Sequence, residues 1–252
     1  GFFMFIDIHC HIDLYKDEEI VGIIERARKV NVNVIINNGT EPDANRRTLY
    51  LSEKYPEIRA SMGIYPLDGL KMNDKDIDLE ISFIRKNKAK IIAIGEVGLD
   101  KKELKDEKDW ERQKKNFLKM INLAKQLDLP IIVHSRKAEL ETIEILERSG
   151  YKKIIMHCFS GKLSLVTRIL NNGWYFTIPT SVTRLEHFQK VIKLVDLDRL
   201  FCETDSPWMN PFGGMSNEPS LVVESYKKIA EIKKISLKDV EKQIEKNYEK
   251  LF

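Results

Sequence analysis

The sequence has few cysteines, no long apolar run and little excess charge. Its three cysteines, Cys10, Cys158 and Cys202, are odd in number and include no CxxC pair, which excludes a dense disulfide framework and predicts a reduced, cytoplasmic setting. No window approaches the roughly 20 apolar residues of a membrane span, and the N-terminal apolar run is too short for a secretory signal. The formal net charge of +3 excludes a nucleic-acid coat protein with a large basic surface, although a local basic site remains compatible with it.

The chain does contain a regular alternation of two patterns over its 252 residues. Longer charged segments with helical spacing, such as 17–30 and 107–128, separate short apolar runs that are typical of buried parallel strands. A final segment from about 218 to 252 is helical throughout, with a break expected near Ile235 and Ser236. The sequence shows no linker or repeat, and it therefore predicts an α/β fold, a closed (β/α)₈ TIM-type barrel that forms a single domain over 1–252. The eight predicted strands are 2–9, 32–38, 58–64, 90–96, 129–135, 152–158, 173–179 and 199–205.

Polar side chains recur where these predicted strands end. Only five histidines are present, and four of them belong to this set, while His187 falls on a predicted surface helix. Because the C-terminal ends of parallel barrel strands share one rim, we expect the set to converge there. Its members are His9, His11, Glu96, His134, His157 and Asp205.

The stretch FIDIHCHID, residues 5–13, carries the strongest local signal. Side chains at alternate strand positions point the same way, so His9 and His11 both face the barrel axis, while Cys10 points into the packed layer behind the strand. Asp7 shares their face at a deeper level, and we expect it to orient the site from below. A single histidine at a barrel rim is usually a hydrogen-bonded polar group, but six such groups on one rim favour a metal site.

The residue types indicate which metal ions this site would bind. Imidazole and carboxylate ligands suit zinc, manganese or iron-type ions better than calcium. Six protein ligands are too many for one catalytic ion, which must keep a position open for water. Two divalent metal ions bridged by a carboxylate fit the count and would clamp the attacking and leaving oxygens of a hydrolytic displacement. An activated water would be the nucleophile, with Asp205 placed to accept its proton.

The ordered sequence blocks resemble those of the TatD-type metal-dependent deoxyribonucleases of the amidohydrolase superfamily. The resemblance implies two divalent ions (zinc, manganese or magnesium) and hydrolysis of DNA phosphodiester bonds, commonly as a 3′–5′ exonuclease on single strands. It also implies that His9 and His11 bind the first ion with Asp205, that His134 and His157 bind the second, and that Glu96 bridges the two as part of the catalytic machinery. The matching blocks are FIDIHCHID (5–13), GEVGLD (95–100), LPIIVHSRKA (129–138), MHCFSG (156–161), ETDSPW (203–208) and NEP (217–219).

Four further residues are candidates for contacts with substrate. Arg136 and Ser135 follow a predicted ligand histidine, and an arginine suits bidentate phosphate binding, although an ion pair with Glu139 is an equal alternative. Tyr65 stands where the resemblance leads one to expect a histidine in a G-x-H-P turn. Trp208 lies on a rim loop, where it would either stack on a base or pack the loop.

Two classes of function therefore remain after the sequence is considered. The first is a deoxyribonuclease with a DNA substrate, and the second is a hydrolase of a lactone, amide or ester, including the ester of an aminoacyl-tRNA, on the same metal centre. A buried set of ligands argues against a non-catalytic binding module, and Arg136 favours phosphate weakly. The sequence indicates neither a membrane association nor a particular protein partner. Glu203, at the end of the last predicted strand, is expected to support the site.

Overall fold

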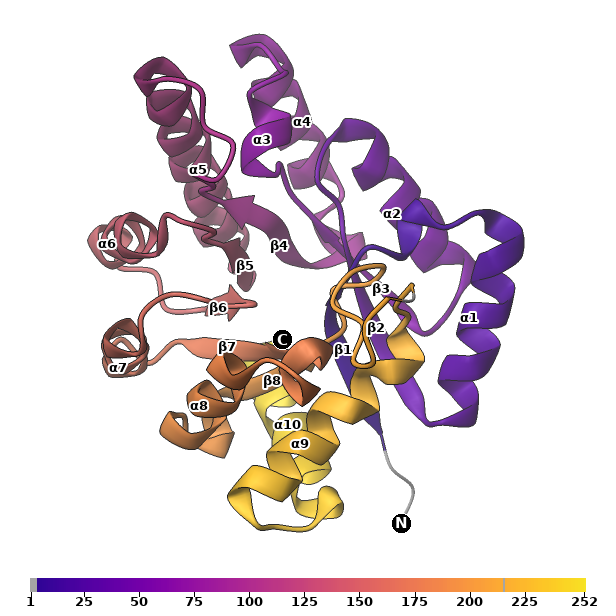
Figure 1. The fold of residues 1–252 in the computed structure, drawn as a ribbon. Coiled ribbons are helices and arrows are strands. Elements are labelled where there is room, and N and C mark those ends of the chain that lie inside the picture. Colours follow the sequence, from indigo (N-terminus) through magenta and orange to yellow (C-terminus); the bar gives the residue numbers. More distant parts are fainter. Residues whose placement is uncertain (1–3, 215) are drawn as a thin grey trace.

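Eight parallel strands form one sheet in chain order in the computed structural model, which describes residues 4–214 and 216–252. The sheet closes where β1 meets the chain that follows β8, because the amide of Asp205 donates to the carbonyl of His9 at 2.9 Å and the amide of His11 donates to the carbonyl of Ser206 at 2.8 Å. This arrangement confirms the predicted (β/α)₈ barrel (Figure 1). The strands are β1 (Phe5–Cys10), β2 (Val32–Asn38), β3 (Ile58–Met62), β4 (Ile91–Gly98), β5 (Ile131–His134), β6 (Ile154–His157), β7 (Tyr175–Pro179) and β8 (Leu200–Glu203).

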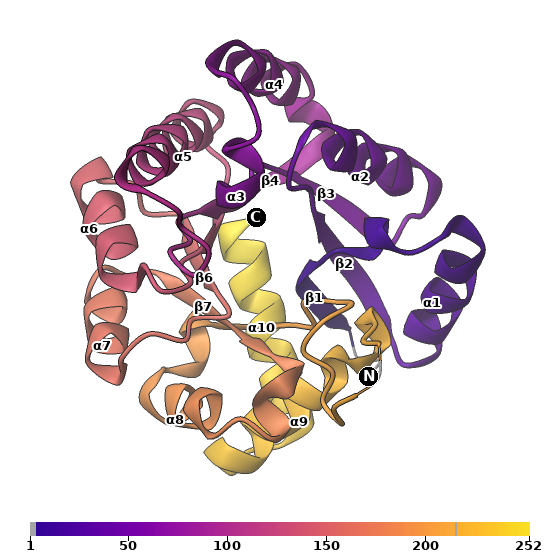
Figure 2. The same cartoon turned by 45° about the horizontal axis from the view of Figure 1, so that its top comes forward.

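Helices surround the strands and cover the outside of the barrel (Figure 2). They are α1 (Asp17–Lys29), α2 (Pro42–Lys54), α3 (Pro66–Gly69), α4 (Asp74–Lys86), α5 (Glu107–Leu127), α6 (Glu139–Ser149), α7 (Leu163–Asn171), α8 (Glu186–Leu194), α9 (Val223–Lys233) and α10 (Leu237–Leu251). Short 3₁₀ turns lie between some of the strands and helices. They are η1 (Ile12–Leu14), η2 (Lys88–Lys90), η3 (Thr180–Thr183), η4 (Leu197–Arg199) and η5 (Pro219–Val222). No helix in the described part of the chain is long and apolar enough to cross a membrane.

Local sequence signals explain where the longest helix begins and ends. The side chain of Asp106 accepts a hydrogen bond from the amide of Asp109 at 2.8 Å and so caps the start of α5, as short acidic side chains commonly do. The helix buries Trp110, Phe117 and Ile121 at a spacing of seven and four residues, which places them on one face. It ends at Asp128, which adopts a left-handed conformation. The predicted span of 107–128 is therefore confirmed to within one residue.

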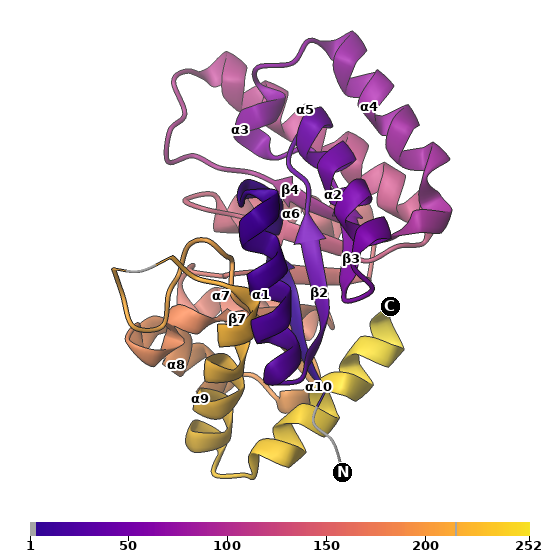
Figure 3. The same ribbon diagram turned by 90° about the vertical axis from the view of Figure 1, so that its right-hand side faces the viewer.

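Helix α10 covers the mouth of the barrel at the N-terminal ends of the strands. The amide nitrogen of the Asn247 side chain donates to the carbonyls of Leu197 and Leu200, both at 2.9 Å. The Phe252 ring packs edge-on against buried Phe201, with ring centroids 6.1 Å apart. Figure 2 shows α10 across the middle of the ring, and Figure 3 shows α9 and α10 together at one end of the molecule. The side chain of Ser236 caps the start of α10 by accepting from the amide of Asp239, which confirms the predicted break.

β2 alone has the predicted bounds, and the other strands differ from theirs by up to three residues at an end. Residues 2 and 3 of the first predicted strand lie outside the described residues, and β1 begins at Phe5. β3, β5, β6, β7 and β8 are shorter than predicted, whereas β4 continues to Gly98, so Glu96 lies within its strand rather than at its end. Gly98 has a φ of +145°, and a Cβ there would lie 1.9 Å from the carbonyl oxygen of His134. This close approach of β4 to β5 requires glycine.

Candidate metal centre

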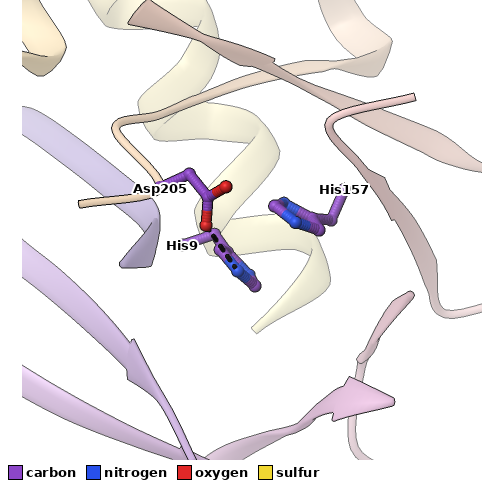
Figure 4. A group of neighbouring side chains, drawn as sticks. All are labelled: His9, His157 and Asp205. Carbon is purple, nitrogen blue, oxygen red and sulfur yellow. Dashed lines mark ion pairs between the residues drawn. The ribbon is translucent and has the colours of Figure 1, made fainter. Parts of the chain in front are cut away.

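Six side chains converge at the rim formed by the C-terminal ends of the strands. They are His9 on β1, His11 just after it, Glu96 on β4, His134 on β5, His157 on β6 and Asp205 after β8. Three overlapping groups of these side chains, each with ligand atoms within 4.8 Å of one another, have the composition of a metal site: His9, His157 and Asp205; His9, His11 and Glu96; and Glu96, His134 and His157. Figure 4 shows the first group, with its three side chains pointing toward one another.

The alternation along β1 separates packing residues from site residues. Ile6, Ile8 and Cys10 are fully buried, and the Cys10 sulfur lies 3.5 Å from the carbonyl of Ile36 on the neighbouring strand. No cysteine belongs to the metal-binding groups found among the described residues. Cys10 is therefore a packed thiol, as the sequence predicts, and burial raises its pKa well above the ordinary value.

Glu96 occupies the centre of the site, and its two oxygens face different partners. Oε2 lies 3.0 Å from Nε2 of His11 and 3.4 Å from Nε2 of His9. Oε1 lies 3.1 Å from Nδ1 of His134 and 3.5 Å from Nε2 of His157. One carboxylate thus joins a pair of histidines from β1 to a pair from β5 and β6.

Asp205 is held beside the first pair of histidines by the backbone bonds that close the barrel. Its Oδ1 lies 3.3 Å from Nε2 of His9 and 3.5 Å from Nε2 of His11. Asp7 fixes the neighbouring chain from below, since its Oδ1 accepts from the amides of Thr204 and His9 at 2.9 and 3.3 Å and its Oδ2 accepts from the Thr204 hydroxyl at 2.5 Å. Burial raises the pKa of Asp7 to about 7.

Hydrogen bonds on the outer side of three imidazole rings orient them for metal binding. Nδ1 of His11 donates to the carbonyl of Asn38 at 2.9 Å, Nε2 of His134 donates to Asp100 at 2.7 Å, and Nδ1 of His157 donates to Glu203 at 2.5 Å. In a neutral ring the other nitrogen then carries a lone pair, and in all three rings that nitrogen faces Glu96. Such outer acceptors are typical of metal-binding histidines, so the residues present fit a divalent ion.

The charges of the site also fit a cation. Burial alone would raise the pKa of Glu96, but the charge of His9 and the hydrogen bonds from His11 and His134 hold it well below its ordinary value. Burial alone would lower the pKa of His134, but hydrogen bonds to Asp100 and Glu96 raise it to about 9. Glu96 thus stays ionised because protons on nearby imidazoles neutralise its charge. A divalent ion would supply the same positive charge.

A pocket of about 840 Å³ opens above the site and is lined by its members His11, Glu96, His134, His157 and Asp205. Tyr65, Ser135 and Arg136 line it beside β3 and β5, whereas Leu14, Leu185 and Trp208 line it near β1, β7 and β8. Because the strands follow one another around the barrel in chain order, the polar wall and the apolar wall face each other across the site. The volume is in the range typical of pockets for small ligands.

The polar wall is organised by Asp100, which the sequence analysis did not single out. Its Oδ2 accepts hydrogen bonds from Nε2 of His134, from Nε of Arg136 at 2.8 Å and from the hydroxyl of Tyr65 at 3.0 Å. Arg136 is thus paired with Asp100 rather than with Glu139. The signal that could have identified Asp100 is its place in the chain, as an acidic residue two positions after β4 on the same rim.

The apolar wall contains an exposed aromatic ring on a fixed backbone. Trp208 is 54% exposed, and its ring meets that of His11 edge-on at a centroid distance of 5.5 Å. The side chain of Asn217 donates to the carbonyls of Trp208 and Thr204 at 2.8 and 2.9 Å, which ties the loop down. Ser135, by contrast, is buried. About half of Trp208 is thus exposed, and the ring is accessible from the pocket that it lines.

Comparisons with known proteins agree over nearly the whole chain. A family model described as "TatD related DNase" matches residues 6–252. A human protein named deoxyribonuclease TATDN3 is 33% identical over 98% of this chain and 94% of its own length. A metal-dependent hydrolase of Methanocaldococcus jannaschii is 36% identical over 98% of this chain and 96% of its own. The crystal structure of the Escherichia coli TatD homologue YjjV superposes with a TM-score of 0.91 at 30% identity and covers 98% of this chain and 97% of that one. The chain therefore belongs to the TatD-related DNase family.

Proposed function

We propose that this metal-dependent hydrolase cleaves phosphodiester bonds of DNA as a 3′–5′ exonuclease on single strands, with two divalent ions bound at the rim of the barrel. In this proposal His9, His11 and Asp205 hold the first ion, and His134 and His157 hold the second. Glu96 bridges the two. The ligand set is rich in nitrogen, which favours zinc or manganese over magnesium.

The division of Glu96 between two histidine pairs is the observation that carries the proposal. Its two oxygens point to His9 and His11 on one side and to His134 and His157 on the other, at 3.0–3.5 Å. A carboxylate that served only one ion would need only one such pair. The second pair of imidazoles is explained by a second ion.

The bound ions would supply Lewis acidity to both sides of an in-line displacement at phosphorus. The protein residues then orient the substrate and move the proton. Asp205 lines the pocket and keeps an ionised carboxylate, because the charge of His157 and hydrogen bonds from His11 and His9 outweigh the effect of burial and lower its pKa. In this proposal it accepts a proton from the attacking water.

The two walls of the pocket match the two parts of a nucleotide. Both terminal nitrogens of Arg136 lack a hydrogen-bond partner among the described residues, and with Ser135 and Tyr65 they form the side that would bind phosphate. The exposed Trp208 ring offers a surface on which a base can stack, which suits unpaired rather than duplex DNA. The human relative is named a deoxyribonuclease, which also supports a DNA substrate.

One observation favours the second candidate, a hydrolase of a lactone, amide or ester, including an aminoacyl-tRNA ester. The guanidinium of Arg136 is already paired with the carboxylate of Asp100 at 2.8 Å, so the net charge of the polar wall is lower than a free arginine would give. A substrate with less negative charge than a phosphate would depend less on electrostatic attraction to this wall. The same six ligands serve both reactions.

The test is a nuclease assay on 3′-labelled single-stranded and duplex oligonucleotides with Mg²⁺, Mn²⁺ or Zn²⁺. We expect stepwise loss of 3′ nucleotides from single strands, and we expect Asp205→Asn to reduce the rate by about 10²–10⁴-fold. Asp128→Asn, which removes an exposed carboxylate paired with Lys153, is the control and should behave as the wild type. Metal-loaded protein that leaves oligonucleotides intact but opens lactones or esters would reject the deoxyribonuclease in favour of the second candidate.

A further inference from the structure

Glu203 is a fully buried carboxylate beneath the metal centre. Only one of its two oxygens takes part in the contacts described above. It ends β8, and its Oε2 accepts a hydrogen bond from Nδ1 of His157 at 2.5 Å. Its Oε1 is buried and has no hydrogen-bond partner among the described residues. A buried acceptor without a donor is unusual in a folded protein and requires an explanation.

A second unpaired atom lies in the same region. His9 is the one histidine of the four at the site whose outer nitrogen, Nδ1, is buried without a partner in the described chain. The other three each donate to a carbonyl or a carboxylate. If Nε2 of His9 offers its lone pair to an ion, Nδ1 carries the proton and needs an acceptor.

The packing of the two rings brings the unpaired donor close to the unpaired acceptor. The rings of His9 and His157 are stacked with centroids 3.6 Å apart and planes inclined by 18°, and Glu203 is bonded to one of them. β1 and the end of β8 are also adjacent, because the carbonyl of His9 accepts from the amide of Asp205. A carboxylate that reaches the His157 ring therefore lies within direct or single-water reach of the ring stacked on it.

Another unpaired buried oxygen near the site is directed elsewhere. Oδ1 of Asn38 lies 3.0 Å from the position that a Cβ on Gly95 would take, so it is turned toward β4. Oγ1 of Thr177 is buried and unpaired as well, and Thr177 is paired in register with His157 and with Phe201, on the Glu203 side of the barrel. It is suited to hold a water between the other two groups.

We propose that Glu203 is a shared positioning residue for the metal centre, with Oε2 accepting from Nδ1 of His157 and Oε1 accepting from Nδ1 of His9, directly or through one water that Thr177 also binds. The inference rests on the proposed two-ion site. His9 belongs to the first ion and His157 to the second. A single buried carboxylate thus fixes the tautomer of one ligand at each ion.

The test is nitrogen NMR of metal-free protein labelled on histidine, in which the chain's five histidines report their tautomers separately. In the wild type we expect His9 and His157 both to carry the proton on Nδ1. In Glu203→Ala both should lose this fixed tautomer, while the nitrogen signals of His11 and His134 stay as they are in the wild type. A change confined to His157 would overturn the proposal.

Glu203→Gln decides the question if the alanine variant does not fold. A glutamine keeps the volume of the side chain but offers one acceptor oxygen instead of two. We expect one of the two rings to lose its Nδ1 proton, whereas both would keep it if the wild-type carboxylate served His157 alone. Glu80→Gln removes a carboxylate that is similarly buried, at 2% exposure, and should leave all histidine signals unchanged.

Metal titration by calorimetry supplies a second readout that does not depend on activity. In Glu203→Ala the affinity of both ions should fall by about 10–100-fold, and weakening of one ion alone would contradict the shared role. In Glu203→Gln only the ion held by the ring that loses its Nδ1 proton should bind more weakly, and unchanged affinity of both ions would contradict the shared role. If the wild type bound no divalent ion, the proposed function would fail, whereas the NMR result on metal-free protein would still decide the role of Glu203.

Discussion

Replacing Asp100 by asparagine is a sensitive test of how the two sides of the site are coupled. Oδ2 of Asp100 accepts from Nε2 of His134 at 2.7 Å, from Nε of Arg136 at 2.8 Å and from the Tyr65 hydroxyl at 3.0 Å. Oδ1 accepts from the amide of Lys102 at 2.8 Å. The side-chain amide of asparagine has one acceptor oxygen and an NH₂ group that only donates, so it cannot accept from these donors on both sides.

The size of the effect follows from the bonds that are lost. Hydrogen bonds to charged groups contribute about 1.5–3 kcal/mol each. The two bonds to charged partners are those from His134 and Arg136. The Arg136 side chain is 36% exposed, so its bond contributes less to stability. We therefore expect the free energy of unfolding of the metal-free protein to fall by about 2–4 kcal/mol. The ring of His134 loses its orienting partner, so the affinity for the second ion should fall by about 10–100-fold.

The assay combines calorimetric titration with Mn²⁺, thermal unfolding and steady-state kinetics. The affinity for the second ion should fall much more than that for the first, and KM for an oligonucleotide should rise because Arg136 is no longer anchored. Asp128→Asn, which removes an exposed carboxylate distant from the rim, is the control and should change none of these quantities. If Asp100→Asn kept both metal affinities and KM, the proposed coupling through Asp100 would be refuted.

Three other perturbations follow from the same geometry. Glu96→Ala should reduce bound metal at both sites by elemental analysis, and loss at one site alone would contradict the bridging role. The pKa of His134 is raised from 6.5 to about 9, so its ion pairs stabilise the metal-free protein fully below pH 6.5 and this stabilisation is lost as the pH rises through 9. Metal affinity should rise over the same window by about tenfold per pH unit for one displaced proton, and a pH-independent affinity would contradict this. Trp208→Ala should raise KM for single strands with little change in unfolding temperature, because the side chain is 54% exposed, whereas Phe212→Ala, a nearby exposed aromatic, should have a smaller effect on KM.

The fold was predictable from the sequence because its strands are continuous apolar runs. IIAIGEVG and IIVH are recognisable without their partners, and parallel strands covered by helices have this composition. The convergence of His9 and Glu96 was also predictable, since the topology places strand ends on one rim. These features depend on periodicity and chain order, which one sequence shows directly.

The contacts around the six side chains were not predictable in the same way. The pairing of Arg136 with Asp100 joins residues 36 positions apart, and local spacing favoured Glu139 equally. His187 lies on α8 as expected, but the contact of its Nε2 with the carbonyl of Phe159, at 3.1 Å, could not be predicted. Phe159 itself packs against Phe176 rather than facing the pocket. Such contacts depend on the three-dimensional course of the loops at the rim, which local sequence spacing does not show.

Anomalous diffraction from crystals loaded with Mn²⁺ or Zn²⁺ tests the central claim most directly. The proposed centre predicts two peaks, one beside His9, His11 and Asp205 and the other beside His134 and His157, with Glu96 bound to both. Data collected on either side of the metal absorption edge would identify the ions. A single peak, or peaks away from Glu96, would contradict the two-ion centre.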